Sequence, residues 1–379
     1  MELARFDADT FLRDYWQKHP LLIRNPWAAW TNPLEPDELA GLACEDGNEA
    51  RLVRRTPKQW KAEHGPFDES RFGKLGKHPW TLLVQAVDHH VPEVAALIAP
   101  FRFVPNWRID DVMVSYASDG GGVGPHFDQY DVFLIQGLGQ RRWQIGSTCD
   151  AATELLAHDD LRLLAEFTPT EEWVLEPGDI LYVPPGVAHN GVAVGDDCMT
   201  YSIGFRAPSR SELIAHWCDH VLAGLDEDDR YGDLDLTAQA NPGEIGPQAL
   251  DRLQAMIAEK LGDQQAFARW FGTYTSARKY PDVDWTPEEP ITVEELREQL
   301  ARDGTLCRNP ASRFSFVRSG LLFVDGESFD YGPDITALAE SICAQDRLTV
   351  TPDLLQSDAA MELLATLFNQ GSVAFDQPD

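Results

Sequence analysis

The chain has 379 residues, more than a single hydrophobic core usually organises, so we expect two or three domains. Its 62 acidic and 31 basic residues give a formal net charge of −31, which argues against nucleic-acid binding and favours cationic partners, although an acidic surface also serves solubility alone. The six cysteines show no short paired spacing, and no stretch approaches the roughly 20 apolar residues of a membrane span, so we expect a cytoplasmic protein without a cysteine metal site.

The first half of the chain is expected to be mainly β-structure. Residues 8–18 have apolar side chains near helical spacing and predict a short helix, and an edge strand follows at 21–23. From about residue 108 to residue 206 the sequence consists of short β-type runs between Gly, Pro and Asp clusters. The runs are DVMVSYA, DVFLIQG, RRWQIG, EWVLEPGDILYVPPG and MTYSIGF. Short strands at this spacing predict a barrel or a sandwich.

Helical patterns replace the strands after Pro208. Residues 211–225 form a predicted helix with one apolar face, and two more helices are expected near 246–262 and 265–273. The apolar face of the first helix consists of Leu213, Trp217, His220, Val221 and Leu225. A two-fold dimer is the commonest way to bury such a face between subunits, so we expect a homodimer.

A linker rich in Pro and acidic residues, at 279–290, is expected to lead into a final unit. This unit begins with a capping box from Thr292 to Glu295. It continues with a hairpin of RFSFVRS and LLFV that ends at Asp325-Gly326, helices near 334–344 and 358–369, and the short strands RLTV and SVAF. This order is typical of a winged helix. Its acidic first helix argues against DNA binding and favours a protein-interaction role.

A candidate metal site lies in the segment GGGVGPHFDQYDVFLIQG, where His126 and Asp128 stand two residues apart, and in PGDILYVPPGVAHNG, which contains His189. Period-two alternation predicts that His126 and Asp128 share one face of a strand. Two histidines and one carboxylate leave coordination positions open, as non-haem Fe(II) needs for a co-substrate and then oxygen. The pattern therefore predicts a catalytic iron centre rather than a closed structural site.

A buried cation is expected in the segment QRRWQI at 140–145. Alternation places Arg141, Trp143 and Ile145 on one face and directs Arg142 to solvent. Because two members of the first face are apolar, this face should point inward, where a cation can hold the distal carboxylate of 2-oxoglutarate. An ordinary surface arginine is the alternative.

The strand at 111–116 mixes polar and apolar side chains on one face. Alternation brings Asp111, Met113 and Ser115 together. If this face lines the mouth of the barrel, Ser115 can hydrogen-bond 2-oxoglutarate and Asp111 can pair with a cationic side chain of a substrate. Asp111 as a simple strand terminator is the alternative.

The order of these motifs resembles the JmjC-type ribosomal oxygenases. The resemblance is greatest to the bacterial branch that hydroxylates carbon 3 of an arginine in large-subunit ribosomal protein sixteen. It extends over nearly the whole chain and rests on long ordered segments. These are FLRDYWQKHPLLI, EPDELAGLA, NWRIDDVMVSY, GGGVGPHFDQYDVFLIQG, EPGDILYVPPGVAH and YSIGFRAPSRSELI.

The resemblance implies a mainly β fold with α-helices in three parts. These are a JmjC double-stranded β-helix, or cupin-like barrel, over residues 1–209, a helical dimerisation region over 210–285 and a winged-helix-like domain over 286–379. It implies Fe(II), 2-oxoglutarate and molecular oxygen as cofactor and co-substrates, and a basic ribosomal protein as substrate. The implied iron ligands are His126, Asp128 and His189, the 2-oxoglutarate contacts are Arg141 and Ser115, and the substrate-arginine pocket is Asp111, Met113, Tyr130 and Ser202.

Other functions remain open on the sequence. A small-molecule 2-oxoglutarate oxygenase and a protein histidine hydroxylase of the same fold use the same metal ligands, and a cupin can bind metal without catalysis. The intact ligand set and Arg141 argue against a non-catalytic cupin. The additional helical and winged-helix regions argue against a small-molecule enzyme, which would not need them.

Overall fold

The computed structural model describes residues 2–56, 59–76, 78–302, 304–355 and 357–376. These residues pack as two compact units. The first unit extends to Ala207 and includes 282–285 and 308–311, and the second contains 208–281, 286–307 and the residues from Ser312 onward. The three-part division at 209/210 and 285/286 stays a prediction. Within the described residues, no helix is both long and apolar enough to cross a membrane.

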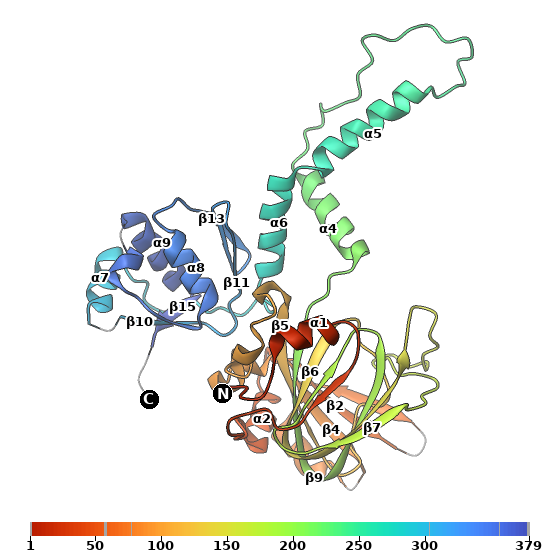
Figure 1. Ribbon diagram of the computed structural model, residues 1–379, viewed down its shortest axis with the longest axis vertical. Coiled ribbons are helices and arrows are strands. Elements are labelled where there is room, and N and C mark those ends of the chain that lie inside the picture. The colour runs from red at the N-terminus through yellow and green to blue at the C-terminus, as the bar shows by residue number, and fades with distance from the viewer. Residues whose placement is uncertain (1, 57–58, 77, 303, 356, 377–379) are drawn as a thin grey trace. The chain divides into compact units, whose positions relative to one another are not determined.

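A nine-stranded antiparallel sheet forms the first unit, with strand order β1-β8-β6-β9-β5-β4-β2-β3 and β7 paired with β6. Figure 1 shows its strands curving around one another. The strands are β1 (Leu21–Ile23), β2 (Ala50–Arg55), β3 (Trp60–His64), β4 (Trp80–Val84), β5 (Ile109–Ala117), β6 (Asp131–Thr148), β7 (Glu171–Leu175), β8 (Ile180–Val183) and β9 (Val187–Phe205).

The runs DVFLIQG and RRWQIG, which we expected as separate strands, belong to the single strand β6. Its pairing with β9 shifts register between Gln136 and Gln140, where Gly139 adopts a φ of +57°. Irregularities of this kind bend a strand without ending it. One long bent strand therefore replaces two short ones, and its two halves pair with β8 and β7 on one side and with β9 on the other.

The two faces of the sheet bury different clusters. One face of β6 places Phe133 and Ile135 in a large aromatic core beneath the N-terminal segments. The other face places Val132, Leu134 and Trp143 in a smaller cluster with residues of β7 and β8. We call this second face, which also carries Arg141, the inner face. Alternation along each strand thus separates the packing residues of the outer face from the candidate site.

Short helices cover the outer face. They are α1 (Ala8–Asp14), α2 (Pro36–Leu42) and α3 (Pro92–Ala95), with single 3-10 turns at Glu69–Lys74, Val87–His89, Ala99–Phe101 and Asn106–Arg108. The helix expected over 8–18 ends at Asp14, because Gln17 adopts a φ of +57° and its N–H donates to the Tyr182 hydroxyl at 2.8 Å. A contact with a distant strand thus shortens the helix.

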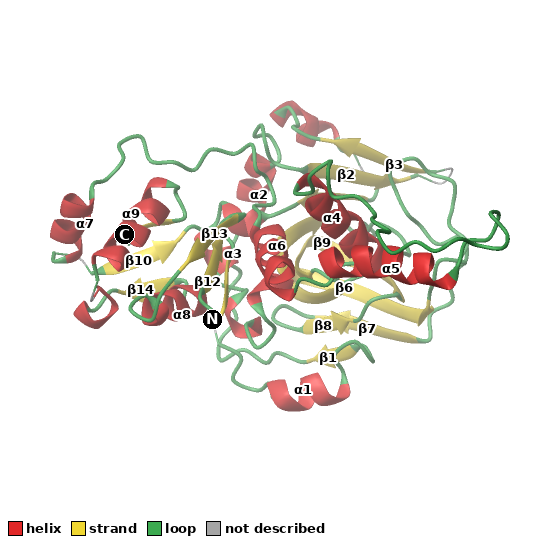
Figure 2. Cartoon of the chain, turned by 90° about the horizontal axis from the view of Figure 1, so that it is seen from above, coloured by secondary structure: helices red, strands yellow, loops and turns green. Residues whose placement is uncertain are grey.

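The second unit begins with three helices, α4 (Arg210–Ala223), α5 (Pro247–Leu261) and α6 (Gln264–Ser276). They are followed by α7 (Val293–Leu300), α8 (Thr336–Ala344) and α9 (Asp358–Asn369), by a 3-10 turn at Pro352–Leu355, and by two three-stranded sheets, β14-β10-β15 and β11-β12-β13. Figure 2 shows α7, α8 and α9 around the strands β10 and β14. The strands are β10 (Thr305–Arg308), β11 (Phe314–Val317), β12 (Leu321–Val324), β13 (Glu327–Asp330), β14 (Arg347–Thr349) and β15 (Val373–Phe375).

Asp325-Gly326, expected at the end of a hairpin, instead joins β12 to the additional strand β13. Both residues have positive φ, +52° and +87°, as a tight hairpin turn requires. The Asp325 carboxylate also accepts hydrogen bonds from Arg278, Ser312 and Ser372, each at 2.7 Å. The turn is therefore fastened to three separate segments of the second unit.

Candidate active site

His126 and His189 lie opposite each other in an antiparallel backbone bridge. The His126 N–H donates to the His189 carbonyl at 3.0 Å, and the His189 N–H donates to the His126 carbonyl at 2.8 Å. Asp128 lies in the segment before β6, where its own carbonyl accepts from the Gly186 N–H at 2.7 Å. Only His126 makes a strand-like bridge, and Asp128 lies outside the strands. The two side chains nevertheless point to the same side, as the period of two predicts.

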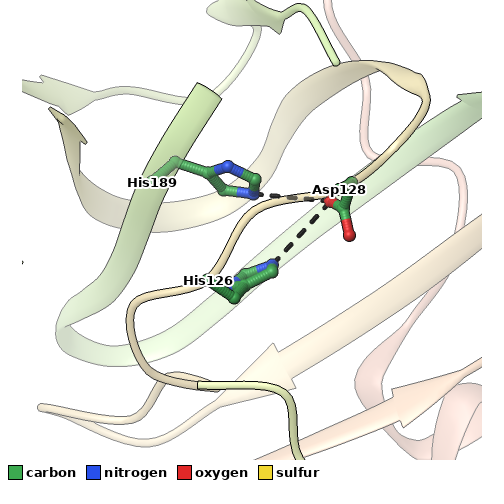
Figure 3. Close-up of side chains that lie close together, drawn as sticks. All are labelled: His126, Asp128 and His189. Atoms are coloured by element: carbon green, nitrogen blue, oxygen red, sulfur yellow. Dashed lines mark ion pairs between the residues drawn. The ribbon is translucent and has the colours of Figure 1, made fainter. Parts of the chain in front are cut away.

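The three side chains converge on one point (Figure 3). Asp128 Oδ2 lies 3.9 Å from His126 Nε2 and 3.6 Å from His189 Nε2. One ligand atom from each residue lies within 4.8 Å of the others, and His189 is buried while His126 and Asp128 are partly exposed. In the part of the chain that the structure describes, no other group of His, Cys, Asp and Glu has this geometry.

Hydrogen bonds orient both imidazole rings. His126 Nδ1 lies 2.9 Å from the Gly124 carbonyl, and His189 Nδ1 lies 2.9 Å from the Val187 carbonyl. A carbonyl can only accept, so each Nδ1 carries the proton and each Nε2 offers its lone pair to the shared point. Burial and the neighbouring His126 lower the pKa of His189 to about 4, so this ring is neutral at physiological pH. The site is thus prepared to bind a divalent cation.

Arg141 is buried on the inner face and is 4% exposed, as alternation predicted, and Arg142 is exposed. The Nη2 of Arg141 donates one long hydrogen bond, 3.5 Å, to the Ser115 hydroxyl. Among the described residues its Nε has no hydrogen-bond partner, and no carboxylate lies within ion-pair distance of its guanidinium. A buried cation is costly unless an anion pairs with it. The residues present therefore fit a co-substrate that brings its own carboxylate.

Three of the residues assigned to the substrate pocket lie on the neighbouring strands β5 and β9, and the fourth, Tyr130, directly precedes β6. Met113 on β5 pairs in register with Ser202 on β9, and both Asp111 and Ser202 are buried, at 5% and 8% exposure. Asp111 does more than end a strand, because its Oδ2 accepts from the Ala86 N–H at 2.9 Å. Tyr130 is 43% exposed. Partial burial, with the nearby carboxylates of Asp128 and Asp111, raises the pKa of Tyr130, so its hydroxyl keeps its proton.

Sequence analysis missed a polar network at the start of β6. The fully buried Asp131 accepts from the Tyr182 hydroxyl at 2.6 Å, from Arg108 at 2.9 Å and from the Gln17 side chain at 3.0 Å. Asp131 follows Asp128 by three residues, so the network anchors the segment that carries the candidate metal ligand. An acidic residue opening the apolar run DVFLIQG was the available signal.

The loop 149–170 also supports the site and was not recognised in the sequence. Its Leu161 and Leu163 are buried in a cluster that Met113 joins, and the Leu164 N–H donates to the Pro125 carbonyl at 2.9 Å. Pro125 directly precedes His126. The loop therefore braces the backbone beside the first candidate ligand.

Two family models match the chain. A JmjC domain matches residues 96–213, and a ROXA-like winged helix matches residues 257–374. The first match contains all of the candidate metal ligands.

Known proteins are similar over almost the full length. Ribosomal protein uL16 3-hydroxylase of Escherichia coli is 39% identical over 370 residues, which is 97% of each chain. An X-ray structure of E. coli YcfD superposes with a TM-score of 0.92 at 37% identity and covers 99% of this chain and 100% of that one. A structure of YcfD, described as a ribosomal oxygenase, in complex with cobalt and 2-oxoglutarate gives a TM-score of 0.88 at 36% identity and covers 99% of each chain.

Proposed function

The chain belongs to the JmjC ribosomal oxygenase family, and from this premise we propose that it hydroxylates carbon 3 of an arginine side chain in ribosomal protein uL16. The observation that carries the proposal is the pairing of two features on one inner face. The ligand set His126, Asp128 and His189 stands on the same face as the buried Arg141, which has no carboxylate partner among the described residues. Their combination fits an Fe(II)- and 2-oxoglutarate-dependent oxygenase.

His126 Nε2, Asp128 Oδ2 and His189 Nε2 would hold the iron, and Arg141 with Ser115 would hold the distal carboxylate of 2-oxoglutarate. With 2-oxoglutarate and molecular oxygen, the bound iron supplies the oxidation that replaces a carbon–hydrogen bond by a carbon–hydroxyl bond. The protein contributes geometry: Arg141 is a pre-placed cation, and the carbonyls of Gly124 and Val187 keep both imidazoles aimed at the metal. The structure of E. coli YcfD in complex with cobalt and 2-oxoglutarate supports the proposal of a metal and of this co-substrate.

The substrate side chain would be held by Asp111, Met113, Tyr130 and Ser202. Asp111 is buried and fixed by Ala86, so it is a rigid partner for a guanidinium. Met113 and Tyr130 would flank the aliphatic stem. Fixing the guanidinium at one end places a methylene, rather than a nitrogen, beside the metal. The net charge of −31 favours the approach of a basic protein.

We also propose a homodimer formed through the second unit. Its interface would use a different helix face from the one that the sequence of residues 211–225 led us to expect. Trp217 is buried in its own chain, where it packs against Phe267 and Trp270 and its Nε1 donates to the Leu261 carbonyl at 3.2 Å. The large apolar side chains that remain exposed on α4 and α5 are Ile214, Leu222, Leu250, Leu253, Ile257 and Leu261. These residues would meet a second copy. We place the protein in the cytoplasm, with its ribosomal substrate.

The test is incubation of the iron-loaded protein with 2-oxoglutarate and a panel of ribosomal peptides, followed by mass spectrometry. We expect one added oxygen on a uL16 peptide, at an arginine side-chain carbon. The same peptide with that arginine replaced by lysine is the control. Modification of a histidine peptide, or succinate production that no peptide stimulates, would contradict the proposal.

A further inference from the structure

One buried glycine of the inner face is required neither by its backbone conformation nor by close packing among the described residues. Strands β6 and β9 contain six glycines. Two of them have positive φ, Gly139 and Gly195. At three others, Gly137, Gly146 and Gly191, an added Cβ would lie 2.5 to 2.9 Å from a neighbouring aromatic ring. Backbone conformation or packing therefore accounts for five of the six.

Gly204 on β9 is the exception. Its φ lies outside the left-handed region, and an added Cβ would meet no atom closer than 3.8 Å, which is ordinary van der Waals contact. The residue is nevertheless buried within a strand, where glycine weakens pairing and packing. Alanine would fit the fold at this position. A strand glycine that the fold does not require indicates that something else approaches the backbone closely.

The atoms around Gly204 identify what approaches. The three nearest to its Cβ position are Asp111 Oδ1 at 3.8 Å, Asp110 Cβ at 3.9 Å and Tyr130 Cε2 at 4.0 Å. Gly204 follows Ser202 by two residues and so shares its strand face. The missing side chain thus leaves space between the carboxylate and the aromatic ring that we assigned to the substrate.

We infer that Gly204 is a specificity-determining residue, whose missing side chain admits the planar guanidinium of a substrate arginine to Asp111. This inference rests on the proposed function for the identity of the substrate. Asp111 Oδ2 accepts from the Ala86 N–H, and Oδ1 lies 3.8 Å from the Cβ position of Gly204. A guanidinium nitrogen bonds a carboxylate oxygen at about 2.8 Å. Approaching Oδ1 from the Gly204 side, it would overlap a methyl group at that position.

The experiment compares Gly204→Ala and Gly204→Val with the wild-type chain and with Gly41→Ala. Gly41 lies in α2, is exposed, and its Cβ position has no atom within 4 Å, so it is a matched glycine-to-alanine control. Binding of a fluorescent uL16 arginine peptide to the cobalt-loaded protein is measured by anisotropy in the presence of 2-oxoglutarate. The same peptide with lysine in place of arginine is measured in parallel, and iron-loaded protein provides the turnover rates.

We expect Gly204→Ala to weaken binding of the arginine peptide by roughly 10- to 100-fold, as overpacking a close contact does, and Gly204→Val to weaken it further. The lysine peptide has a slimmer head group and should lose less, so the arginine-to-lysine preference should fall. The urea midpoint of Gly204→Ala should not fall, and the KM for 2-oxoglutarate should stay at its wild-type value, whereas a merely structural role of Gly204 predicts a lower midpoint.

Wild-type affinity and preference in Gly204→Ala would overturn the inference, as would an equal loss for both peptides. If the wild-type chain binds the arginine peptide without hydroxylating it, the proposed function fails, and the change in preference still decides the role of Gly204. If the wild-type chain binds neither peptide, the inference is overturned together with the substrate assignment.

Discussion

Two buried charged side chains of this protein differ in the number of hydrogen-bond partners that the fold gives them. In the second unit, Asp325 is about one-tenth exposed and is surrounded by donors: Arg278, Ser312, Ser372 and the Arg313 N–H. In the first unit, Arg141 is more deeply buried, and its only hydrogen bond to the described residues is a 3.5 Å contact with Ser115. The first charge is satisfied within its own fold, and the second is not.

This difference separates a structural charge from a binding charge. Removing one member of a satisfied pair leaves the other uncompensated, so Asp325 should contribute to stability. Arg141 has no anionic partner among the described residues, so its burial costs stability in the free protein until an anion binds. Substitutions at the two residues test this distinction, because loss of Asp325 should lower stability and loss of Arg141 should lower the affinity for 2-oxoglutarate.

The largest effect is expected at the metal ligands. His189→Ala should abolish iron binding and peptide-dependent succinate formation, because the remaining ligands, His126 and Asp128, no longer enclose the shared point. Iron content after desalting and succinate production measure the two losses. Folding should survive, and a circular dichroism spectrum checks it. Coupled turnover at the wild-type rate would exclude His189 from the centre.

Asp325→Asn should cost the second unit roughly 3 kcal/mol of unfolding free energy, because it leaves Arg278 without its anionic partner. Asparagine tolerates the positive φ of this position, so the substitution removes the charge without straining the turn. Urea unfolding followed by tryptophan fluorescence measures the change. The KM for 2-oxoglutarate serves as the control, since every partner of Asp325 named here belongs to the second unit. An unchanged urea midpoint would mean that satisfaction of this charge does not stabilise the fold.

Arg141→Met should show the reverse pattern. Loss of a charge-assisted contact should weaken 2-oxoglutarate binding by roughly 10- to 100-fold. The free protein should be as stable as the wild type or more stable, because an apolar side chain of similar length replaces a buried cation without an anionic partner. Calorimetric titration measures the affinity for 2-oxoglutarate, and urea unfolding without 2-oxoglutarate measures the stability of the free protein. A clear loss of stability together with normal affinity would mean that Arg141 stabilises the fold rather than binds 2-oxoglutarate.

Arg142→Gln is expected to have the smallest effect. Arg142 neighbours Arg141 but points outward, where it lies 3.5 Å from Glu172 with both side chains about half exposed. An exposed pair of this kind contributes less than about 1 kcal/mol. Unfolding free energy and the KM for 2-oxoglutarate should both remain near wild-type values. A large rise in that KM would transfer the proposed role from Arg141 to Arg142.

Sequence periodicity could predict the side-chain directions on the inner face, because strand alternation is a local property. Arg141, Asp111 and Ser115 are all buried where the period of two placed them. The buried position of Trp217 was not predictable, since α4 looks equally apolar whether its partner is α6 or a second chain. The apolar face that α4 leaves exposed therefore differs from the face that we expected.

The partners of Asp131 could not be predicted from the sequence either. The network joins Gln17, Arg108, Asp131 and Tyr182, which come from four separate segments. Only the folded sheet brings these segments together. The added strand β13 has a similar origin, because a four-residue strand is recognisable only by its pairing with β12. Local sequence patterns predict the direction of a side chain on its strand, whereas contacts between distant segments determine which residues it pairs with.

The backbone pairing of His126 with His189 has a consequence for the order of folding. The two residues are 63 positions apart, and their reciprocal hydrogen bonds form only when the chain between them, including all of β6, β7 and β8, has closed into a loop. Closing such a loop costs chain entropy before any ligand can contribute. Metal capture is therefore a late event, reserved for chains whose sheet is already assembled. A nascent or damaged chain would lack the centre, so iron uptake would report that the sheet is assembled.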